Sequence, residues 1–293
     1  MNIMHGYRDD KHLRDSFNQL AEQTFGLNFE GWYQNGFWGD HYDPHSMILD
    51  GKVVSNVSVN RTDLVIGEKR YHILQLGTVM TDPEYRGRGF GRAIMAYIEE
   101  KYADADGVYL FANDSVVDYY PRFGFRPGVE YGYSKTVSLN GESKVEQVIM
   151  DGPAAWARLA AAMDRSTFPS GCAMVDNPGL IFFYVSQFMQ EAVWYIPHLD
   201  AWAIAEPEEG VLTIHSIFAD ASVTIDAVAA AFGAVTELRL GFAPADREGW
   251  EITEIHEEDT HFFVKGAVDC TAKTCKHHGF IIKIYTEHLV GCL

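Results

Sequence analysis

One stretch of the sequence combines residue types that suit a phosphate-bearing ligand. In "VMTDPEYRGRGFGRA" (79–93), an apolar run stops at a Pro, a loop of alternating glycines follows, and residues at helical spacing come next. Glycine lets the backbone approach a ligand closely, and the first N–H groups of a helix lie at the positive end of its dipole. The pattern therefore predicts a pyrophosphate-binding loop, although a plain glycine turn between strand and helix would look the same.

Two common phosphate-binding loops do not fit this stretch. A dinucleotide-binding loop needs Gly-x-Gly-x-x-Gly, but Arg92 stands at the third glycine position after Gly87 and Gly89. A Walker loop needs Gly-Lys-Ser or Gly-Lys-Thr after its glycines, and the stretch lacks both. What remains is the pattern Arg-x-x-Gly-x-Gly, formed by Arg86, Gly89 and Gly91 directly before the predicted helix.

Two other groups of polar residues resemble metal ligands but have unsuitable spacing. Asp43 lies between His41 and His45, yet Pro44 would break any helix that aligned them. The stretch "CTAKTCKHHGF" (270–280) gathers cysteines and histidines at a spacing that matches no standard zinc site. We therefore expect no metal.

Composition narrows the range of partners. The 293 residues include 23 Lys and Arg against 41 Asp and Glu, which gives a net charge of −18. Such a charge repels nucleic-acid backbones and attracts cationic small molecules, so we expect no nucleic-acid partner. The sequence shows no secretory pattern and no apolar run long enough to cross a bilayer. With only four cysteines, the chain is expected to be cytoplasmic and reduced, with no membrane partner.

The surrounding sequence predicts the strands and helices that would position the glycine loop. In the first half the predicted strands are 46–51, 52–60, 71–80 and 107–113. A helix is predicted within 9–26, and the glycine loop with its helix is predicted over about 86–103. Past about Lys144 the predicted strands are 180–188, 201–206, 211–219, 235–242 and 260–266, and the predicted helices are 154–163 and 223–233. The second half repeats the order of elements without repeating the sequence. We therefore expect two α+β lobes, 1–144 and 145–293.

Two motifs together make the sequence resemble the GCN5-related N-acetyltransferase (GNAT) superfamily. The first is "VMTDPEYRGRGFG", and the second, about thirty residues later, is "NDSVVDYYPRFGF". In that family the first motif binds the pyrophosphate and pantetheine of acetyl-CoA. The second runs from an Asn through an aromatic-Tyr pair to Gly-Phe, and only Val116 and Pro121 depart from it here. The resemblance covers about residues 10–135 and implies an α+β fold, with a mixed, mostly antiparallel sheet flanked by helices.

The resemblance also implies roles for individual residues. Tyr120 matches the tyrosine that gives a proton to the departing thiolate, and Tyr119 is its competitor. A main-chain N–H on the strand before the loop is expected to face the thioester oxygen. The catalytic residues so implied are Tyr120 and Asn113. The cofactor-binding residues so implied are Val79, Thr81, Arg86, Gly87, Arg88, Gly89, Phe90, Gly91, Arg92 and Asn113.

The aromatic stretch "FEGWYQNGFWGDHYDPHS" (29–46) lies where GNAT folds usually cover the acceptor. Aromatic rings interleaved with carboxylates suit a cationic amine, but they equally suit a buried flap with solvated acids. The residues predicted to bind the acceptor are Glu30, Trp32, Tyr33, Trp38, Asp40 and Tyr42. The general base stays open among the carboxylates and histidines of this stretch, with a water chain as the alternative.

The second half contains no counterpart of the glycine loop. Its corresponding stretch, "FADASVTIDAVA" (218–229), has neither glycine nor arginine. We therefore expect a degenerate GNAT-like accessory lobe, with a plain α+β domain as the alternative, and one acetyl-CoA per chain. The resemblance implies an N-acetyltransferase that moves an acetyl group from acetyl-CoA to a primary amine, small or peptide, by direct attack in a ternary complex. A homodimer is compatible with this, and a non-catalytic regulatory protein that binds acetyl-CoA is the rival hypothesis.

Overall fold

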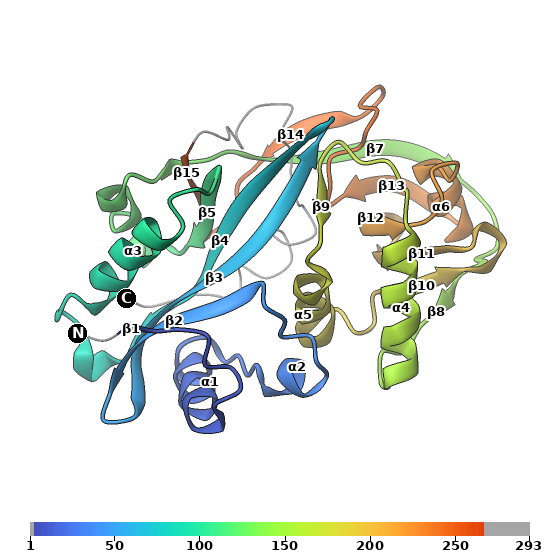
Figure 1. Cartoon of the computed structure of the whole chain (residues 1–293). Helices are drawn as coiled ribbons and strands as arrows, with labels where there is room; N and C mark the ends of the chain where they lie inside the picture. The colour runs from blue at the N-terminus through green and yellow to red at the C-terminus, as the bar shows by residue number, and fades with distance from the viewer. Residues whose placement is uncertain (1–2, 267–293) are drawn as a thin grey trace.

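Two β-sheets organise the protein in this computed structural model, which describes residues 3–266 (Figure 1). The stretch 270–280, considered above for metal ligands, lies outside the described residues. The first sheet comprises β1 (Ile3–Met4), β2 (Tyr42–Leu49), β3 (Lys52–Ile66), β4 (Lys69–Thr81), β5 (Gly107–Ala112), β6 (Arg126–Pro127), β9 (Ala173–Val175) and β15 (His261–Gly266). The second comprises β7 (Glu130–Leu139), β8 (Glu146–Gln147), β10 (Val193–Ile196), β11 (Ala201–Glu208), β12 (Val211–Phe218), β13 (Val235–Leu240) and β14 (Glu251–Ile255).

Helices cover both faces of the first sheet. α1 (Lys11–Phe25) and α2 (Glu30–Gln34) pack on one face, and α3 (Phe90–Lys101) packs on the other. α4 (Pro153–Arg165) and α6 (Ile225–Ala231) contact the second sheet. Short 3₁₀ turns are η1 (Pro83–Tyr85), η2 (Asp114–Val116), η3 (Tyr120–Phe123) and η4 (Pro197–Leu199). Among the described residues, none of the helices has the length and apolar character needed to cross a membrane.

The helix that follows the glycine loop is held on the sheet by an apolar stripe. α3 starts after Gly89, whose φ angle of 79° lies in the left-handed region that glycine adopts without strain. Phe90, Ile94 and Ile98 are buried and recur at four-residue spacing, so they share one face of the helix. Burying that face against the sheet fixes the position of the loop at the N-terminus of α3.

The same strand–helix–strand unit occurs in each sheet. β4 and β5 are parallel neighbours joined through α3, and β12 and β13 are parallel neighbours joined through α6. The other pairings between described strands are antiparallel. This mixed, mostly antiparallel architecture confirms the predicted α+β class, and the repeated unit supports the expectation of two similarly built lobes.

Three strands cross the boundary predicted at residue 144. β7 precedes that boundary but pairs with β13 and β14 in the second sheet. β15 lies near the end of the described chain but pairs with β5 and β6 in the first sheet. β9 also follows the boundary and pairs with β3 in the first sheet. Each sheet is therefore completed by a strand from the other half of the sequence. The sequence did not reveal this exchange because strand propensity carries no information about which sheet a strand joins.

One predicted strand is wrong, since residues 180–188 belong to helix α5 (Pro178–Phe188). Asn177 caps this helix by accepting a hydrogen bond from the Leu180 N–H at 3.2 Å, and Pro178 stands in its first turn. The helix lies between the two sheets (Figure 1) and has no polar face, so its sequence lacks helical periodicity. Its residues from Leu180 to Val185 are all buried.

Candidate active site

A gap between two parallel strands lies directly before the glycine loop. β4 pairs with β5 only over residues 73–76. It then continues to Thr81, so 77–81 has no neighbour in β5. The open side of this stretch can pair with an extended ligand, as the edge of a sheet does. Val79 and Thr81, the predicted backbone contacts, both lie in this unpaired stretch.

The glycine loop itself has an open, left-handed backbone. Gly87 and Gly89 have φ angles of 75° and 79°, and no atom lies within 4 Å of the position that a Cβ would take on either residue. These glycines therefore allow the left-handed backbone conformation, and the space beside them is open. Gly89 is the N-cap of α3, and no side chain caps the first N–H groups of the helix there. An exposed helix start of this kind is suited to bind an anion.

Arginine side chains place positive charge around this loop. Arg86 donates to the Thr81 carbonyl at 3.3 Å, and Arg88 donates to the Glu84 carbonyl at 3.2 Å. The Arg88 guanidinium also lies 4.7 Å from the centre of the Tyr85 ring. These contacts keep two guanidinium groups beside the open backbone, where a pyrophosphate could be bound by charge-assisted hydrogen bonds.

The remaining predicted residues of the loop differ in exposure. Phe90 is buried against the sheet, whereas Gly91 is half-buried and Arg92 is exposed in the first turn of α3. Asn113 is buried at the end of β5, where it accepts a hydrogen bond from the Ser115 hydroxyl at 2.6 Å. The structure therefore brings Arg92 and the loop backbone to the surface, and it places Phe90 as a packing residue.

The two candidate acids occupy different environments. Tyr120 is 3% exposed and packs against the rings of Phe125 and Phe263, with centroid distances of 6.1 and 5.8 Å. Burial raises the pKa of the Tyr120 phenol above its usual range. Tyr119 is half-buried, and burial raises the pKa of its phenol while the nearby charge of Arg92 opposes that rise. Both phenols therefore keep their protons at neutral pH, as a proton donor must.

The predicted carboxylates of the acceptor site are already paired. Glu30 accepts a hydrogen bond from Arg14 at 2.8 Å, and this contact holds the pKa of Glu30 below its usual range. Asp40 lies 2.7 Å from a guanidinium nitrogen of Arg8 and is itself exposed. Each acid thus has an arginine partner, and the lowered pKa of Glu30 does not suit a general base at neutral pH.

The predicted aromatic residues of the acceptor site also differ. Trp32 and Trp38 are buried in the core and donate their indole N–H groups to backbone carbonyls. Tyr33 donates to an exposed aspartate beside α1. Tyr42 reaches β4 instead, with its hydroxyl 2.7 Å from the Thr78 hydroxyl. Among the six predicted acceptor residues, Tyr42 is therefore joined to β4 by a side-chain hydrogen bond.

Sequence reasoning missed a set of buried polar residues behind β4. Asn56 and Ser58 are fully buried on β3, and Thr78 is nearly so on β4. They bond to one another, with Asn56 Nδ2 2.9 Å from the Ser58 hydroxyl and the Thr78 hydroxyl 2.6 Å from the same atom. A signal was available in "SNVSVN" (55–60), because polar residues in a strand covered on both faces must find partners inside the protein.

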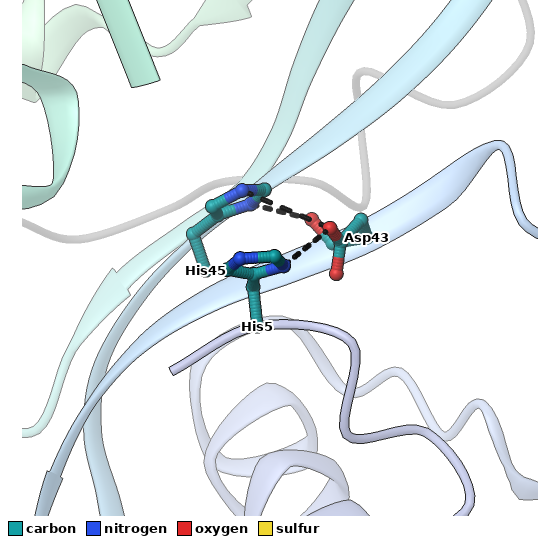
Figure 2. Close-up of side chains that lie close together, drawn as sticks. All are labelled: His5, Asp43 and His45. Atoms are coloured by element: carbon teal, nitrogen blue, oxygen red, sulfur yellow. Dashed lines mark hydrogen bonds and ion pairs between the residues drawn. The ribbon is translucent and has the colours of Figure 1, made fainter. Parts of the chain in front are cut away.

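A second polar cluster lies beneath α3 and consists of His5, Asp43 and His45 (Figure 2). Asp43 Oδ2 is 3.1 Å from His5 Nδ1 and 3.8 Å from His45 Nε2. The two rings are stacked at 5.0 Å, and the Lys101 ammonium lies 3.2 Å from His5 Nε2. His41, which the sequence analysis grouped with Asp43 and His45, contacts a backbone carbonyl instead. Parallel rings and an adjacent ammonium favour a hydrogen-bonded cluster over a shared ion.

The first half of the chain matches a known family. Residues 10–128 fit the family model described as an acetyltransferase (GNAT) domain. This range contains the glycine loop, the gap beside β4 and both candidate tyrosines. No curated protein matches the chain.

Solved structures share the fold over most of the chain. A probable N-acyltransferase from Enterococcus faecalis V583 is 13% identical, with a TM-score of 0.60 over 92% of this chain and 73% of its own. A GCN5-related N-acetyltransferase from Kribbella flavida is 17% identical, with a TM-score of 0.51 over 94% and 74%. Eis1 from Mycobacterium abscessus is 15% identical, with a TM-score of 0.54 over 89% and 73%. The predicted GNAT fold is thereby confirmed.

Proposed function

We propose that the chain transfers an acetyl group from acetyl-CoA to a primary amine of a small molecule or peptide, because residues 10–128 match the acetyltransferase (GNAT) domain model. The observation that carries this proposal is the continuity of the gap beside β4 with the open glycine loop at the start of α3. The gap beside β4 is suited to pair with an extended chain, and the glycine loop that follows it is suited to bind an anion. Pantetheine and pyrophosphate occur in this order in coenzyme A.

The proposed reaction needs a polarised carbonyl, a neutral amine and an acid. The backbone of 77–81 supplies N–H groups beside the gap, and a preorganised donor there stabilises the oxyanion as the amine attacks. The amine nitrogen forms a bond to the acetyl carbon, and the bond between that carbon and sulfur breaks. The electron pair leaves with sulfur, which takes a proton from Tyr120, while the amine loses one to solvent or to a base. The protonated state of the Tyr120 phenol supports this assignment.

Glycine loop residues are proposed to hold the pyrophosphate. Arg86, Arg88 and Arg92 supply charge, and Gly87, Gly89 and Gly91 let the backbone approach. Asn113, at the end of β5, is proposed to border the same gap. On the acceptor side, Tyr42 is the best supported of the proposed contact residues, because its hydroxyl is hydrogen-bonded to Thr78 on β4. The net charge of −18 favours a cationic amine.

The second lobe is proposed to be an accessory lobe, with one acetyl-CoA bound per chain. Like β4, β12 extends beyond its pairing with its parallel neighbour, because it pairs with β13 only over 211–214 and continues to Phe218. Residues 167–171 bond to the chain just beyond the ends of these two strands. The Thr167 N–H donates to the carbonyl of Ala219 at 2.9 Å, and the Gly171 N–H donates to the carbonyl of Ala243 at 2.8 Å. The missing glycine loop in "FADASVTIDAVA" (218–229) supports a single cofactor site.

A panel of amines tests the proposed function. The purified chain is mixed with acetyl-CoA and each amine in turn, and free thiol is measured over time. Thiol release that depends on an amine, together with a mass increase of one acetyl group on that amine, is the expected result. If acetyl-CoA binds but no amine accelerates thiol release, the chain is a regulatory binding protein and the proposed activity is wrong.

A further inference from the structure

Thr78 has an unusual backbone conformation for its residue type. Its φ angle is 44°, in the left-handed region that β-branched residues rarely adopt. The other described non-glycine residues with positive φ are all acidic, namely Asp50, Asp176, Asp200, Glu209 and Asp259. Strain of this kind persists only where the surrounding structure holds it, and it clusters at functional sites.

The strained residue lies at a bulge in the cofactor strand. Asn56 pairs with Met80 and Ser58 pairs with Gly77, so two residues of β4 face one residue of β3. A bulge leaves one residue outside the ladder and re-aims its backbone. Pairing of β4 with β5 has ended two residues earlier, at position 76. The bulge therefore lies in the part of β4 that is unpaired on its other side.

Three side chains from two strands hold Thr78. Asn56 Nδ2 donates to the Thr78 carbonyl at 2.8 Å, and the Thr78 hydroxyl donates to Ser58 Oγ at 2.6 Å. From β2, the Tyr42 hydroxyl lies 2.7 Å from the Thr78 hydroxyl. Because both the carbonyl and the side chain of Thr78 are fixed, the peptide group that follows it has one orientation.

Asn56 is the centre of this network. Its Oδ1 accepts from the Ser46 hydroxyl at 2.8 Å, and its Nδ2 donates to Ser58 as well as to Thr78. The Ser46 hydroxyl is in turn 2.6 Å from the hydroxyl of Tyr7, which precedes α1. Asn56 is fully buried, and burying a carboxamide is unfavourable unless its donors and acceptor are satisfied, as they are here.

We propose that Asn56 is a positioning residue for acyl transfer, an inference that rests on the proposed function. By holding the Thr78 carbonyl, Asn56 fixes the peptide group between Thr78 and Val79 in the gap beside β5. An N–H donor that is already oriented stabilises a developing oxyanion, whereas a donor that must first reorient does so less well. Asn56 itself contacts neither cofactor nor amine, and its effect passes through the backbone of β4.

Replacing Asn56 with alanine tests this inference, because the change removes the hydrogen bond to Thr78 without altering the glycine loop. The kcat for acetyl transfer to the best amine should fall by roughly 10-fold or more, since a misplacement of about 1 Å at a reacting group can reduce the rate about 10²-fold. The calorimetric Kd for acetyl-CoA should stay close to the wild-type value, because the pyrophosphate contacts are unchanged. Circular dichroism checks that Asn56→Ala is folded.

A second substitution separates positioning from stability. In the Asn56→Ala background, Thr78→Gly should restore much of the lost kcat, because glycine adopts the left-handed conformation without support. Thr78→Ala in the same background removes the same hydroxyl but keeps the Cβ, so it should restore little. Thr62→Val is the matched control. Thr62 lies on β3, as Asn56 does, and is 2% exposed. Its hydroxyl has no hydrogen-bond partner among the described residues, so the kcat of Thr62→Val should equal that of the wild type.

Each outcome decides the inference. An Asn56→Ala variant that melts earlier but keeps its kcat would make Asn56 a purely structural residue. Equal rescue by glycine and alanine at position 78 would also overturn the proposal. If Asn56→Ala does not fold, Ser58→Ala, which removes an acceptor for the Thr78 hydroxyl, is measured with the same two rescues. A wild-type chain that acetylates no amine refutes the proposed function, whereas active wild type with unaffected variants refutes only the inference.

Discussion

Two adjacent tyrosines compete for one chemical role at the residue scale. Tyr120 matches the family motif but is nearly buried, while Tyr119 is more exposed and lies close enough to Arg92 for its charge to act on the phenol. Neighbouring residues in a helical turn point about 100° apart, so only one of them can face the departing sulfur. Burial raises the pKa of both phenols, so the position of each hydroxyl, and not its acidity, decides which tyrosine protonates the sulfur.

Tyr120→Phe should lower kcat by roughly 10²-fold, because it removes the proton donor and keeps the ring. The Kd for acetyl-CoA should change little. Tyr119→Phe is the matched control and should have the smaller effect. A steady-state comparison in which Tyr119→Phe loses more activity than Tyr120→Phe would shift the assignment of the acid by one residue.

His45 gives the stability of the fold a defined pH dependence. Burial lowers the pKa of His45 from 6.5 to about 4, and the neighbouring charge of Asp43 only partly opposes this effect. Between these values the unfolded chain binds a proton that the folded chain does not. The free energy of unfolding therefore decreases as the pH falls from about 6.5 to about 4, and the contribution of His45 is complete above that window.

The melting temperature of His45→Asn should consequently depend less steeply on pH than that of the wild type over this window. The exposed His198 provides the control, since His198→Asn should keep the wild-type slope. Differential scanning fluorimetry at closely spaced pH values measures these slopes. Equal slopes for all three chains would show that His45 does not titrate as its burial indicates.

Among the structural elements, the glycine loop should affect acetyl-CoA binding more than it affects the stability of the fold. Gly89→Ala places a Cβ on a left-handed residue and should weaken acetyl-CoA binding at least about 10-fold, because the backbone must leave its cradle conformation. Gly67→Ala is the matched control. Gly67 has a φ angle of 61° and equally open surroundings, but it lies in the turn between β3 and β4.

Both glycine variants should lose a similar, small amount of stability, about 1 kcal/mol for an alanine forced into the left-handed region. Calorimetric titration with acetyl-CoA should then distinguish them. Unchanged affinity in Gly89→Ala, or an equal loss in Gly67→Ala, would contradict the role of the loop as a phosphate cradle.

The elements also show what a single sequence can predict. The glycine loop, α3 and the strands beside them follow from local patterns, because each carries its own periodicity or turn residues. α5 was misread because a helix buried on every side has no polar face to reveal its period. The Thr78 bulge and its network were missed because they depend on partners from three strands, and no local pattern encodes such partners.

At the scale of the whole molecule, the exchange of β7 and β15 ties the two lobes together. The first sheet needs β15 to cover β5, and the second needs β7 between β13 and β14. A chain cut near residue 144 would leave β5 as an open edge and β7 without its sheet. The proposed division into 1–144 and 145–293 therefore describes the order of the lobes along the chain rather than two units that fold alone.

A 1–144 fragment should accordingly be insoluble or aggregate on size-exclusion chromatography, while the full chain elutes as a defined species. Exposed apolar surface from the missing partners is the physical cause. Adding a 145–293 fragment during refolding should recover soluble material, because it supplies β15 for the first sheet. A soluble 1–144 fragment with full transfer activity would show that the first lobe folds without the exchanged strand.

We propose that one cofactor site, formed by the gap beside β4 and the glycine loop, serves the whole chain. Calorimetric titration of the full chain with acetyl-CoA tests this most directly. One molecule should bind per chain, and binding should be severely weakened in Gly89→Ala. Two molecules per chain, or affinity unaffected by Gly89→Ala, would contradict it.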